Sequence, residues 1–260
     1  SEAPASEAPA SEAPAGDGAA DDSWAKIQQK GKFIMGLDKS FPPMGFLDEN
    51  GELVGFDIDL ARAVAEQMGV EVELRPINWS MKEMELDSGN IDVIWNGYTI
   101  TDERKEKVLM SEPYLENMQV ILVKGDSDIA AISDLSGKTV AVQEGSSAQS
   151  LLVEEMPDVS GTFKELKSYT DYTLALLDID SGQADALGVD LVVADYYMAK
   201  KTGEYKILEE SLAPEQYGIG FRKGEQSFHD ALMGAFEELK ANGKAAEVSQ
   251  AWFGRDVTAG

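Results

Sequence analysis

The chain of 260 residues contains no cysteine and only one histidine, His229. Without thiols it can form neither a disulfide framework nor a zinc thiolate site, and it has no thiol nucleophile. His229 stands between Phe228 and Asp230 on a predicted surface helix, where we expect a structural role. Histidine-dependent catalysis is therefore poorly supported, and we expect neither a metal nor a cofactor.

Basic residues are scarce, because 22 Lys and Arg stand against 48 Asp and Glu, giving a net charge of −26. Nucleic acids and anionic lipids bind clustered cations, so neither is expected as a partner. No apolar run approaches the roughly 18–20 residues that span a bilayer, and no signal segment opens the chain. Apolar residues still make up 43% of the chain, enough for one large domain or two small ones.

The amino-terminal segment lacks large apolar side chains, since residues 1–15 are three copies of Ser-Glu-Ala-Pro-Ala. Such a segment cannot bury enough surface to offset its chain entropy. We therefore expect residues 1–23 to be a disordered, self-repelling tether, with a solubilising tail as the alternative. A lipid-anchored protein on a Gram-positive surface would use such a spacer, so we expect an extracytoplasmic protein anchored at the cell surface rather than a free periplasmic one.

Strand and helix patterns alternate through the rest of the chain, from Trp24 onward, and the alternation restarts after Pro113. The expected strands are 32–37, 70–74, 91–95, 118–124, 139–143, 163–167 and 184–189. The expected helices are 57–68, 81–86, 147–155, 172–181, 191–200 and 227–241. This alternation predicts parallel sheets flanked by helices, and its repetition indicates two α/β lobes.

The helix predicted to begin after Thr101 has a cation in its first turn, where the helix dipole disfavours positive charge. Thr101 is a suitable N-cap, and Asp102 and Glu103 suit the positive end of the helix dipole. Arg104 does not, because a cation there costs about 0.3–1 kcal/mol unless an anion lies nearby. Arg104 is therefore a candidate for anion binding, with a solvated charged helix face as the alternative.

Ligands of α/β sheets bind beyond the carboxyl ends of the strands. The loops expected there carry Asp38, Phe41, Trp79, Gly97, Thr99, Arg104, Ser146, Ser147 and Asp190. Each of these has an ordinary structural alternative. The serines and Asp190 could be helix caps, and the two aromatic residues could belong to the core.

Four motifs together resemble the polar amino-acid solute-binding proteins of ABC importers. They are Gly55–Ala61, Asn96–Lys105, Val142–Ser147 and Gln216–Gly220, in the family's order within residues 32–254. The resemblance implies a type II periplasmic-binding-protein fold, with two α/β lobes joined by a two-stranded hinge. It implies a monomer that closes over a free L-amino acid and delivers it to a membrane permease.

The same resemblance implies how the chain is divided. Lobe 1 would consist of residues 24–117 and 218–260, and lobe 2 of residues 118–217. The hinge would lie at Glu116–Met118 and Gln216–Gly218, where a glycine can absorb a change of backbone dihedrals.

By this resemblance, Arg104 would bind the ligand α-carboxylate, helped by backbone N–H groups of Thr99, Ser146 and Ser147. Asp190 would hold the α-ammonium together with the Gly97 carbonyl and the Thr99 hydroxyl. The side-chain stem of the ligand would lie between Phe41 and Trp79.

Side-chain selectivity is expected from Asp38, Asn78, Gln143 and Glu144. The two acids Asp38 and Glu144 favour a cationic side chain, arginine or lysine, because a buried carboxylate requires a charged partner. An aspartate at this position of the family also serves neutral amides, so glutamine, histidine and cystine stay open. Gln143 stands where some glutamine binders have a lysine, which argues against glutamine.

An enzyme on the same fold, resembling the cyclohexadienyl dehydratases, is the alternative from another class. It would need a general acid in the cleft, which Glu144 or Glu215 could supply. A complete amino-acid clamp leaves such a group no evident role, so we expect a binding protein and not an enzyme. A third possibility is the ligand-sensing domain of a receptor kinase or a ligand-gated channel, whose output domain this chain would not contain.

Overall fold

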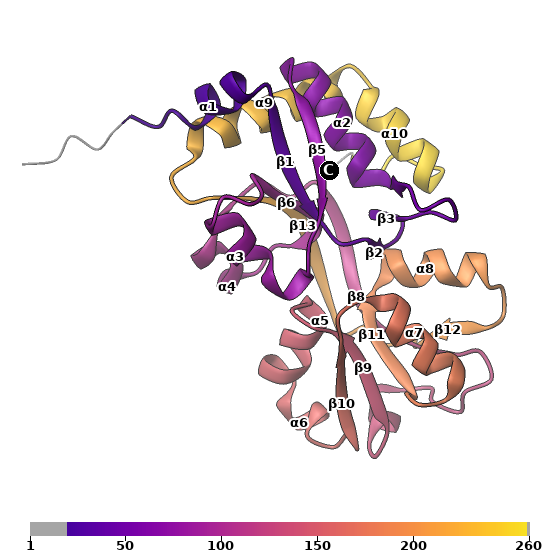
Figure 1. The fold of residues 1–260 in the computed structure, drawn as a ribbon. Helices are drawn as coiled ribbons and strands as arrows, with labels where there is room; N and C mark the ends of the chain where they lie inside the picture. Colours follow the sequence, from indigo (N-terminus) through magenta and orange to yellow (C-terminus); the bar gives the residue numbers. More distant parts are fainter. Residues whose placement is uncertain (1–19, 259–260) are drawn as a thin grey trace, which may run out of the picture.

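The computed structural model describes residues 20–258, which fold into two lobes that lie one above the other in Figure 1. Most of the expected tether lies outside the described residues. Helix α1 (Ser23–Lys30) begins one residue before the expected start of the folded body. The hydroxyl groups of Ser23 and Ser227 lie 2.9 Å apart, and the Asp21 carboxylate accepts a hydrogen bond from the Ser227 N–H. The folded body therefore begins at Asp21, inside the expected tether.

The upper lobe contains a four-stranded sheet whose order is β13-β6-β1-β5. Its strands are β1 (Lys32–Leu37), β5 (Glu71–Pro76), β6 (Val93–Thr99) and, from the other end of the chain, β13 (Ala213–Phe221), with β7 (Leu109–Met110) beside β13. The first three are parallel, and β13 runs antiparallel to β6. A small second sheet consists of β2 (Ser40–Phe41), β3 (Gly45–Leu47) and β4 (Leu53–Val54).

The lower lobe continues the same sheet in the order β10-β9-β11-β8. Its strands are β8 (Leu115–Lys124), β9 (Thr139–Gln143), β10 (Glu165–Tyr169), β11 (Ala186–Asp190) and β12 (Tyr205–Ile207). Strands β8 and β13 pair with each other from Leu115 and Tyr217 to Gln119 and Ala213, and they join the lobes side by side in Figure 1. This is the two-lobed α/β fold with a two-stranded hinge that the sequence predicts.

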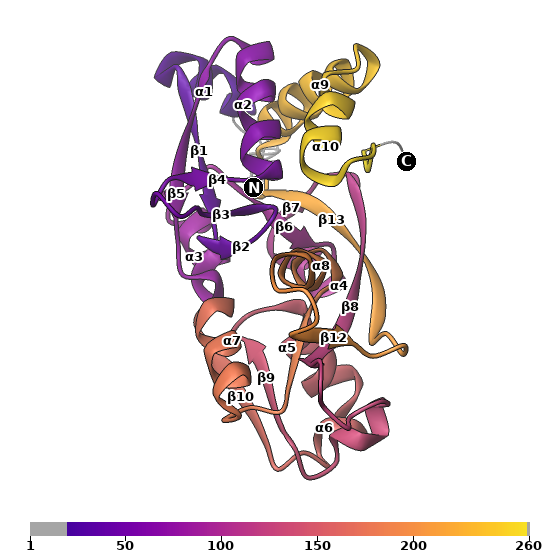
Figure 2. The same cartoon turned by 90° about the vertical axis from the view of Figure 1, so that its right-hand side faces the viewer.

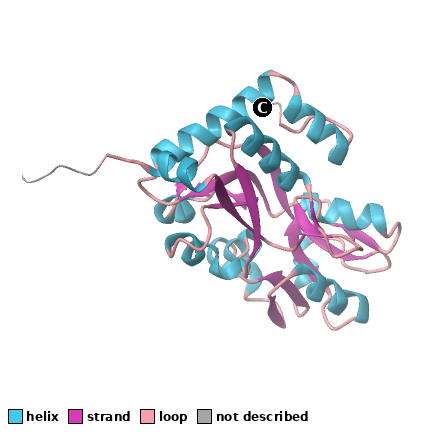
Figure 3. Ribbon diagram, turned by 45° about the horizontal axis from the view of Figure 1, so that its top comes forward, coloured by secondary structure: helices cyan, strands magenta, loops and turns pink. Residues whose placement is uncertain are grey.

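Helices cover the outside of the strands in both lobes (Figure 3). Those of the upper lobe are α1, α2 (Phe56–Met68), α3 (Lys82–Asp87), α4 (Asp102–Lys107), α9 (Gln226–Ala241) and α10 (Lys244–Phe253). Those of the lower lobe are α5 (Ser147–Ser150), α6 (Pro157–Ser160), α7 (Tyr172–Ser181) and α8 (Leu191–Lys200). Figure 2 shows α9 and α10 beside α2, so the end of the chain packs on its beginning.

Several predicted elements differ in their bounds from the structure, and two of these differences affect the candidate site. The predicted strand 91–95 extends to Thr99, so Gly97 and Thr99 lie within strand β6 instead of in a turn after it. The predicted helix 147–155 is regular only to Ser150, and a π-helical turn covers Leu151–Glu155. Pro157 is the first residue of α6. A proline disfavours the helical conformation for the residue before it, so Met156 separates the two helical segments.

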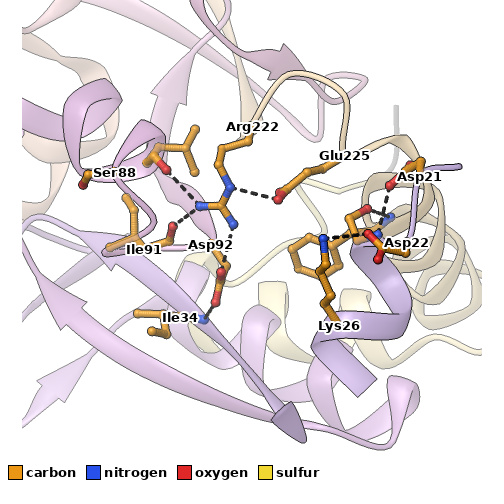
Figure 4. Close-up of polar contacts among 12 residues, drawn as sticks. Asp21, Asp22, Lys26, Ile34, Ser88, Ile91, Asp92, Arg222 and Glu225 are labelled. Carbon is orange, nitrogen blue, oxygen red and sulfur yellow. Dashed lines mark hydrogen bonds and ion pairs between the residues drawn. The ribbon is translucent and has the colours of Figure 1, made fainter. Parts of the chain in front are cut away.

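The carboxyl-terminal segment is fixed to the upper lobe by Arg222, which directly follows β13 (Figure 4). Its guanidinium forms ion pairs with Asp92 at 3.0 Å and with Glu225 at 2.8 Å. It also donates to the carbonyl oxygens of Leu86, at the end of α3, and Ile91. Asp92 in turn accepts the N–H of Ile34, so one arginine connects the last crossing of the chain to β1 and α3.

The motif Gly55–Ala61 supports the end of β6. Asp57, in the first turn of α2, is fully buried and accepts the N–H of Gly97 at 2.7 Å and the hydroxyl of Tyr114 at 2.8 Å. Burial raises the pKa of Asp57 to about 7. The carboxyl group thus fixes the backbone of Gly97, one of the predicted site residues.

Candidate functional site

The carboxyl ends of four strands meet between the lobes. Asp38 follows β1 and Thr99 ends β6 in the upper lobe, while Gln143 ends β9 and Asp190 ends β11 in the lower lobe. All four side chains are buried. The Gln143 amide donates to the Asp38 carboxylate, and the hydroxyl groups of Thr99 and Ser147 lie 3.4 Å apart. The two lobes are therefore in direct contact around the predicted site.

Arg104 is buried beside this contact, which removes the alternative of a solvated helix face. Its Nη1 donates to the Thr99 carbonyl at 2.9 Å, and its Nη2 donates across the lobes to the Gly145 carbonyl at 3.2 Å. The guanidinium carbon lies 4.6 Å from the centre of the Tyr98 ring. None of the ion pairs within residues 20–258 includes Arg104. A buried cation held by carbonyls and a ring favours an anionic ligand.

In the lower lobe, Ser146 and Ser147 stand at the start of α5, directly after Gly145, whose carbonyl accepts a hydrogen bond from Arg104. The Ser146 hydroxyl caps α5 by accepting the N–H of Gln149, whereas the Ser147 hydroxyl accepts from the Gln119 amide at 3.0 Å. A cavity of about 470 Å³ has Thr99, Arg104 and Ser147 in its lining. The structure thus brings together the predicted carboxylate-binding residues.

Asp190 stands at the N-cap position of α8, but its side chain does not cap that helix. It accepts hydrogen bonds from the Asn117 amide at 2.9 Å, the Tyr217 hydroxyl at 2.5 Å and the Tyr172 hydroxyl at 3.5 Å. Burial, and after it the nearby Glu215 carboxylate, raise the pKa of Asp190 well above its usual range. A buried carboxylate with neutral donors alone favours a cationic ligand group.

The hinge strands carry polar residues that sequence reasoning missed. The side-chain amides of Asn117 and Gln119 both donate to Glu215, at 2.6 and 2.8 Å. Their carbonyl oxygens, Oδ1 and Oε1, are buried and have no hydrogen-bond partner among residues 20–258. Asn117 and Gln119 are two residues apart in β8 and therefore lie on the same face of this strand. This spacing is visible in the sequence and could have identified the pair. Two orphaned acceptors next to Asp190 favour a ligand rich in hydrogen-bond donors.

The two predicted aromatic walls are buried. The Phe41 ring lies 5.7 Å from that of Tyr172 in the other lobe, and a Cβ on Gly97 would lie 2.5 Å from it. Gly97 also has a φ of +58°, so both its conformation and this packing require glycine. Trp79 packs edge-on against Tyr98 at 6.0 Å. Enclosure of a ligand between Phe41 and Trp79 stays a prediction.

Residues 33–255 match the family model described as bacterial extracellular solute-binding proteins, family 3. The chain belongs to this family. It is 32% identical to the L-cystine-binding protein TcyJ of Escherichia coli (strain K12), over 90% of this chain and 86% of that protein.

Solved structures of the family share the fold. A substrate-binding protein of an ABC uptake transporter from Streptococcus pneumoniae, with bound histidine, superimposes with a TM-score of 0.88. It is 39% identical and the match covers 92% of this chain and 99% of that one. An ancestral arginine-binding protein bound to arginine gives a TM-score of 0.80 at 39% identity, covering 86% and 98% of the two chains.

In this solute-binding protein, the predicted selectivity residues separate into two groups. Asp38 and Asn78 line a cavity of about 280 Å³ together with Asp171, which sequence reasoning missed. The Asp38 carboxylate accepts the N–H and the hydroxyl of Ser40, and burial raises its pKa. Glu144 is exposed and does not line this cavity, so the second acid near Asp38 is Asp171.

Gln143 and Asn78 have structural partners as well. The Gln143 amide donates to the Thr170 carbonyl at 3.3 Å in addition to Asp38, and the Asn78 side chain caps a short 3₁₀ helix, η1 (Trp79–Met81).

Within residues 20–258, no helix of this family member is long and apolar enough to cross a bilayer.

Proposed function

We propose that the protein is the substrate-binding component of an ABC importer for polar amino acids and that its ligand carries a cationic side chain, arginine or lysine. The proposal rests on the charges of the buried side chains between the lobes. One cation, Arg104, stands without an ion pair, while Asp190 and Asp38 are buried carboxylates bound only by neutral donors. A cationic amino acid supplies one anion and two cations, which complements this arrangement.

The α-carboxylate would bind Arg104 and the backbone N–H groups of Thr99, Ser146 and Ser147. Arg104 can bind the carboxylate with two parallel hydrogen bonds if its Nη2 leaves the Gly145 carbonyl. The hydrogen bond from Nη2 to that carbonyl is long, at 3.2 Å. The α-ammonium would bind Asp190, next to the unpartnered Asn117 and Gln119 oxygens.

The ligand side chain would extend past Phe41 and Trp79 toward Asp38. The nearby Asp171 adds negative charge there, since it is one of the groups that raise the pKa of Asp38. Binding a guanidinium or ammonium between these acids would compensate the cost of their burial. Relatives whose names specify cystine and arginine, and a structure with histidine, support the polar amino-acid class.

Capture would proceed by lobe closure without chemistry. The open form would bind the zwitterion on one lobe, here taken as residues 24–117 with 218–260, and lobe 2, residues 118–217, would then close. A ligand shifts this equilibrium only if it binds the closed form more tightly. The closed monomer would then dock on its membrane permease.

A thermal-shift screen tests the ligand assignment. The protein is refolded to remove bound ligand and is heated with each of the twenty amino acids, ornithine, citrulline and cystine. We expect arginine and lysine to raise the melting temperature, because a ligand of the native state stabilises it by mass action. Citrulline is the matched control, since it has nearly the shape of arginine without the charge.

Asp38→Asn is expected to reduce the difference between arginine and citrulline. An equal shift with citrulline, or a shift with glutamine or cystine alone, would keep the amino-acid site and contradict the cationic assignment. No shift with any compound would contradict the binding function itself, and prephenate turnover would then be measured.

We also propose that the Ser-Glu-Ala-Pro-Ala repeats at residues 1–15 separate the binding lobes from a lipid anchor on the cell surface. Their acidic charge and their lack of large apolar side chains are the composition of a spacer. Mass spectrometry of the amino terminus of the native protein is expected to find a lipid. An unmodified amino terminus would contradict the anchor and leave the binding function untouched.

A further inference from the structure

A second cation, Lys82, lies at the boundary between the lobes, and none of the predicted roles includes it. It is the first residue of α3 and is only 3% exposed. Its ammonium donates to the Trp79 carbonyl at 3.2 Å within the upper lobe and to the Gly145 carbonyl at 3.0 Å in the lower lobe. A lysine so buried requires compensation, and one of its two hydrogen bonds goes to the opposite lobe.

The Gly145 carbonyl is the point where the two lobe-1 cations meet, because it also accepts Arg104 Nη2. Gly145 directly precedes Ser146 and Ser147, the turn expected to bind the ligand carboxylate. Its φ of +73° favours glycine, and a Cβ there would lie 2.8 Å from the Cα of Ser80. The backbones of the two lobes therefore lie in close approach at Gly145 and Ser80.

We propose that Lys82 is a positioning residue that holds the turn 145–147 across the cleft and so stabilises the closed form without touching the ligand. The inference rests on the proposed function. When Arg104 turns its Nη2 to the ligand carboxylate, Lys82 becomes the remaining charged donor to the Gly145 carbonyl. The turn then keeps its orientation while its N–H groups bind the carboxylate.

The charges around Lys82 determine how the contact responds to pH. Glu83 Oε2 lies 3.5 Å away and its other oxygen accepts the Tyr98 hydroxyl. Helix α4 contributes the cations Arg104 and Lys107 and the acid Glu103, whereas the hydrogen-bond partner from the lower lobe is the neutral Gly145 carbonyl. Burial, followed by repulsion from Arg104, lowers the pKa of Lys82 to about 7.

A carboxylate bound at Arg104 adds a negative charge nearby and should raise the pKa of Lys82. Ligand binding then takes up a proton above about pH 7, and by linkage the affinity falls as the pH rises. Asp190 has the opposite effect, because the ligand ammonium lowers its raised pKa and binding then releases a proton. The contribution of Lys82 is therefore measured by comparing the wild type with a variant that lacks the Lys82 charge.

The test compares the wild type with Lys82→Met, which keeps the length of the side chain and removes its charge. Calorimetry with L-arginine is carried out at about pH 6.5, 7 and 8. We expect the wild-type affinity to fall about fivefold from pH 7 to pH 8. Lys82→Met should bind about tenfold more weakly at pH 6.5, without the alkaline fall. The exposed Lys105→Met, on α4, is the matched control and should behave as the wild type.

A second measurement needs no variant. Calorimetry of the wild type at about pH 8 in phosphate and in Tris reports the protons exchanged on binding, and net uptake is expected. Wild-type affinity and pH dependence in a folded Lys82→Met would overturn the inference, and so would an absence of proton uptake by the wild type. If the wild type itself fails to bind arginine, the proposed cationic ligand fails and this inference fails with it.

Discussion

Arg104→Ala is expected to lower the affinity for arginine by about 2–5 kcal/mol, because it removes the only cation assigned to the ligand carboxylate. The carboxylate would then be desolvated without a charged partner, against backbone N–H groups alone. Arg104→Lys should give an intermediate loss, since a lysine provides one point donor in place of a planar pair. Titration calorimetry at neutral pH measures both.

Lys105→Ala is the control for Arg104→Ala. Lys105 is the next residue of α4, carries the same charge and is exposed. Its removal changes the net charge of the protein equally but should leave the affinity within about twofold. Unchanged arginine binding by a folded Arg104→Ala protein would refute the carboxylate assignment.

Asp190→Asn is expected to change affinity and stability in opposite directions. Affinity for arginine should fall by about 2–5 kcal/mol, because the α-ammonium loses its charged partner. The melting temperature of the ligand-free protein should rise, because a carboxylate buried beside Glu215 without a cation destabilises the native state at neutral pH. The rise should be about 2–4 °C for each kcal/mol gained.

The hydrogen bonds around Asp190 can accommodate the amide. Asn117 and Tyr217 both donate to Oδ2, which the asparagine oxygen can replace, and the new NH₂ group can then face the Tyr172 oxygen 3.5 Å from Oδ1. Asp158→Asn, at an exposed position on α6, is the matched control for the loss of one negative charge. A variant that loses stability and keeps its affinity would assign Asp190 a structural role.

The pH dependence of the ligand-free protein follows from the same carboxyl group. Its folded pKa lies above the unfolded value near 3.9, so the folded form binds more protons between the two values. The free energy of unfolding therefore falls as pH rises through that window. Asp190→Asn should remove part of this slope, while the slope from the buried Asp38 and Asp57 remains.

Local signals in the sequence predicted several of the residues that the structure brings together between the lobes. Arg104 was detectable because it opposes the dipole of its own helix, and the alternation of strands and helices indicated which ends face the cleft. Asp190 was ambiguous, because an aspartate before a helix usually caps it. Only the structure shows its carboxylate turned to Asn117 and Tyr217 instead of to α8.

The residues that the sequence did not reveal depend on contacts between distant segments. Lys82 is 63 positions from the carbonyl it binds in the other lobe, and Asn117 meets Glu215 across 98 positions. Asp171 precedes α7 and caps it, so no local signal distinguishes it from an ordinary helix cap. Glu144 directly follows Gln143, but β9 ends at Gln143 and Glu144 is exposed in the turn after it.

The position of β13 also determines when the upper lobe can be completed during synthesis. This strand lies between β8 and β6, yet it is made after the whole lower lobe. A growing chain that stops before residue 213 leaves one side of β6, with Gly97 and Thr99, as an unpaired sheet edge. The lower lobe is continuous and has its strands by then. Strand β6 is therefore paired on this side only after the segment from residue 213 onward has been made, and a truncated chain exposes its edge.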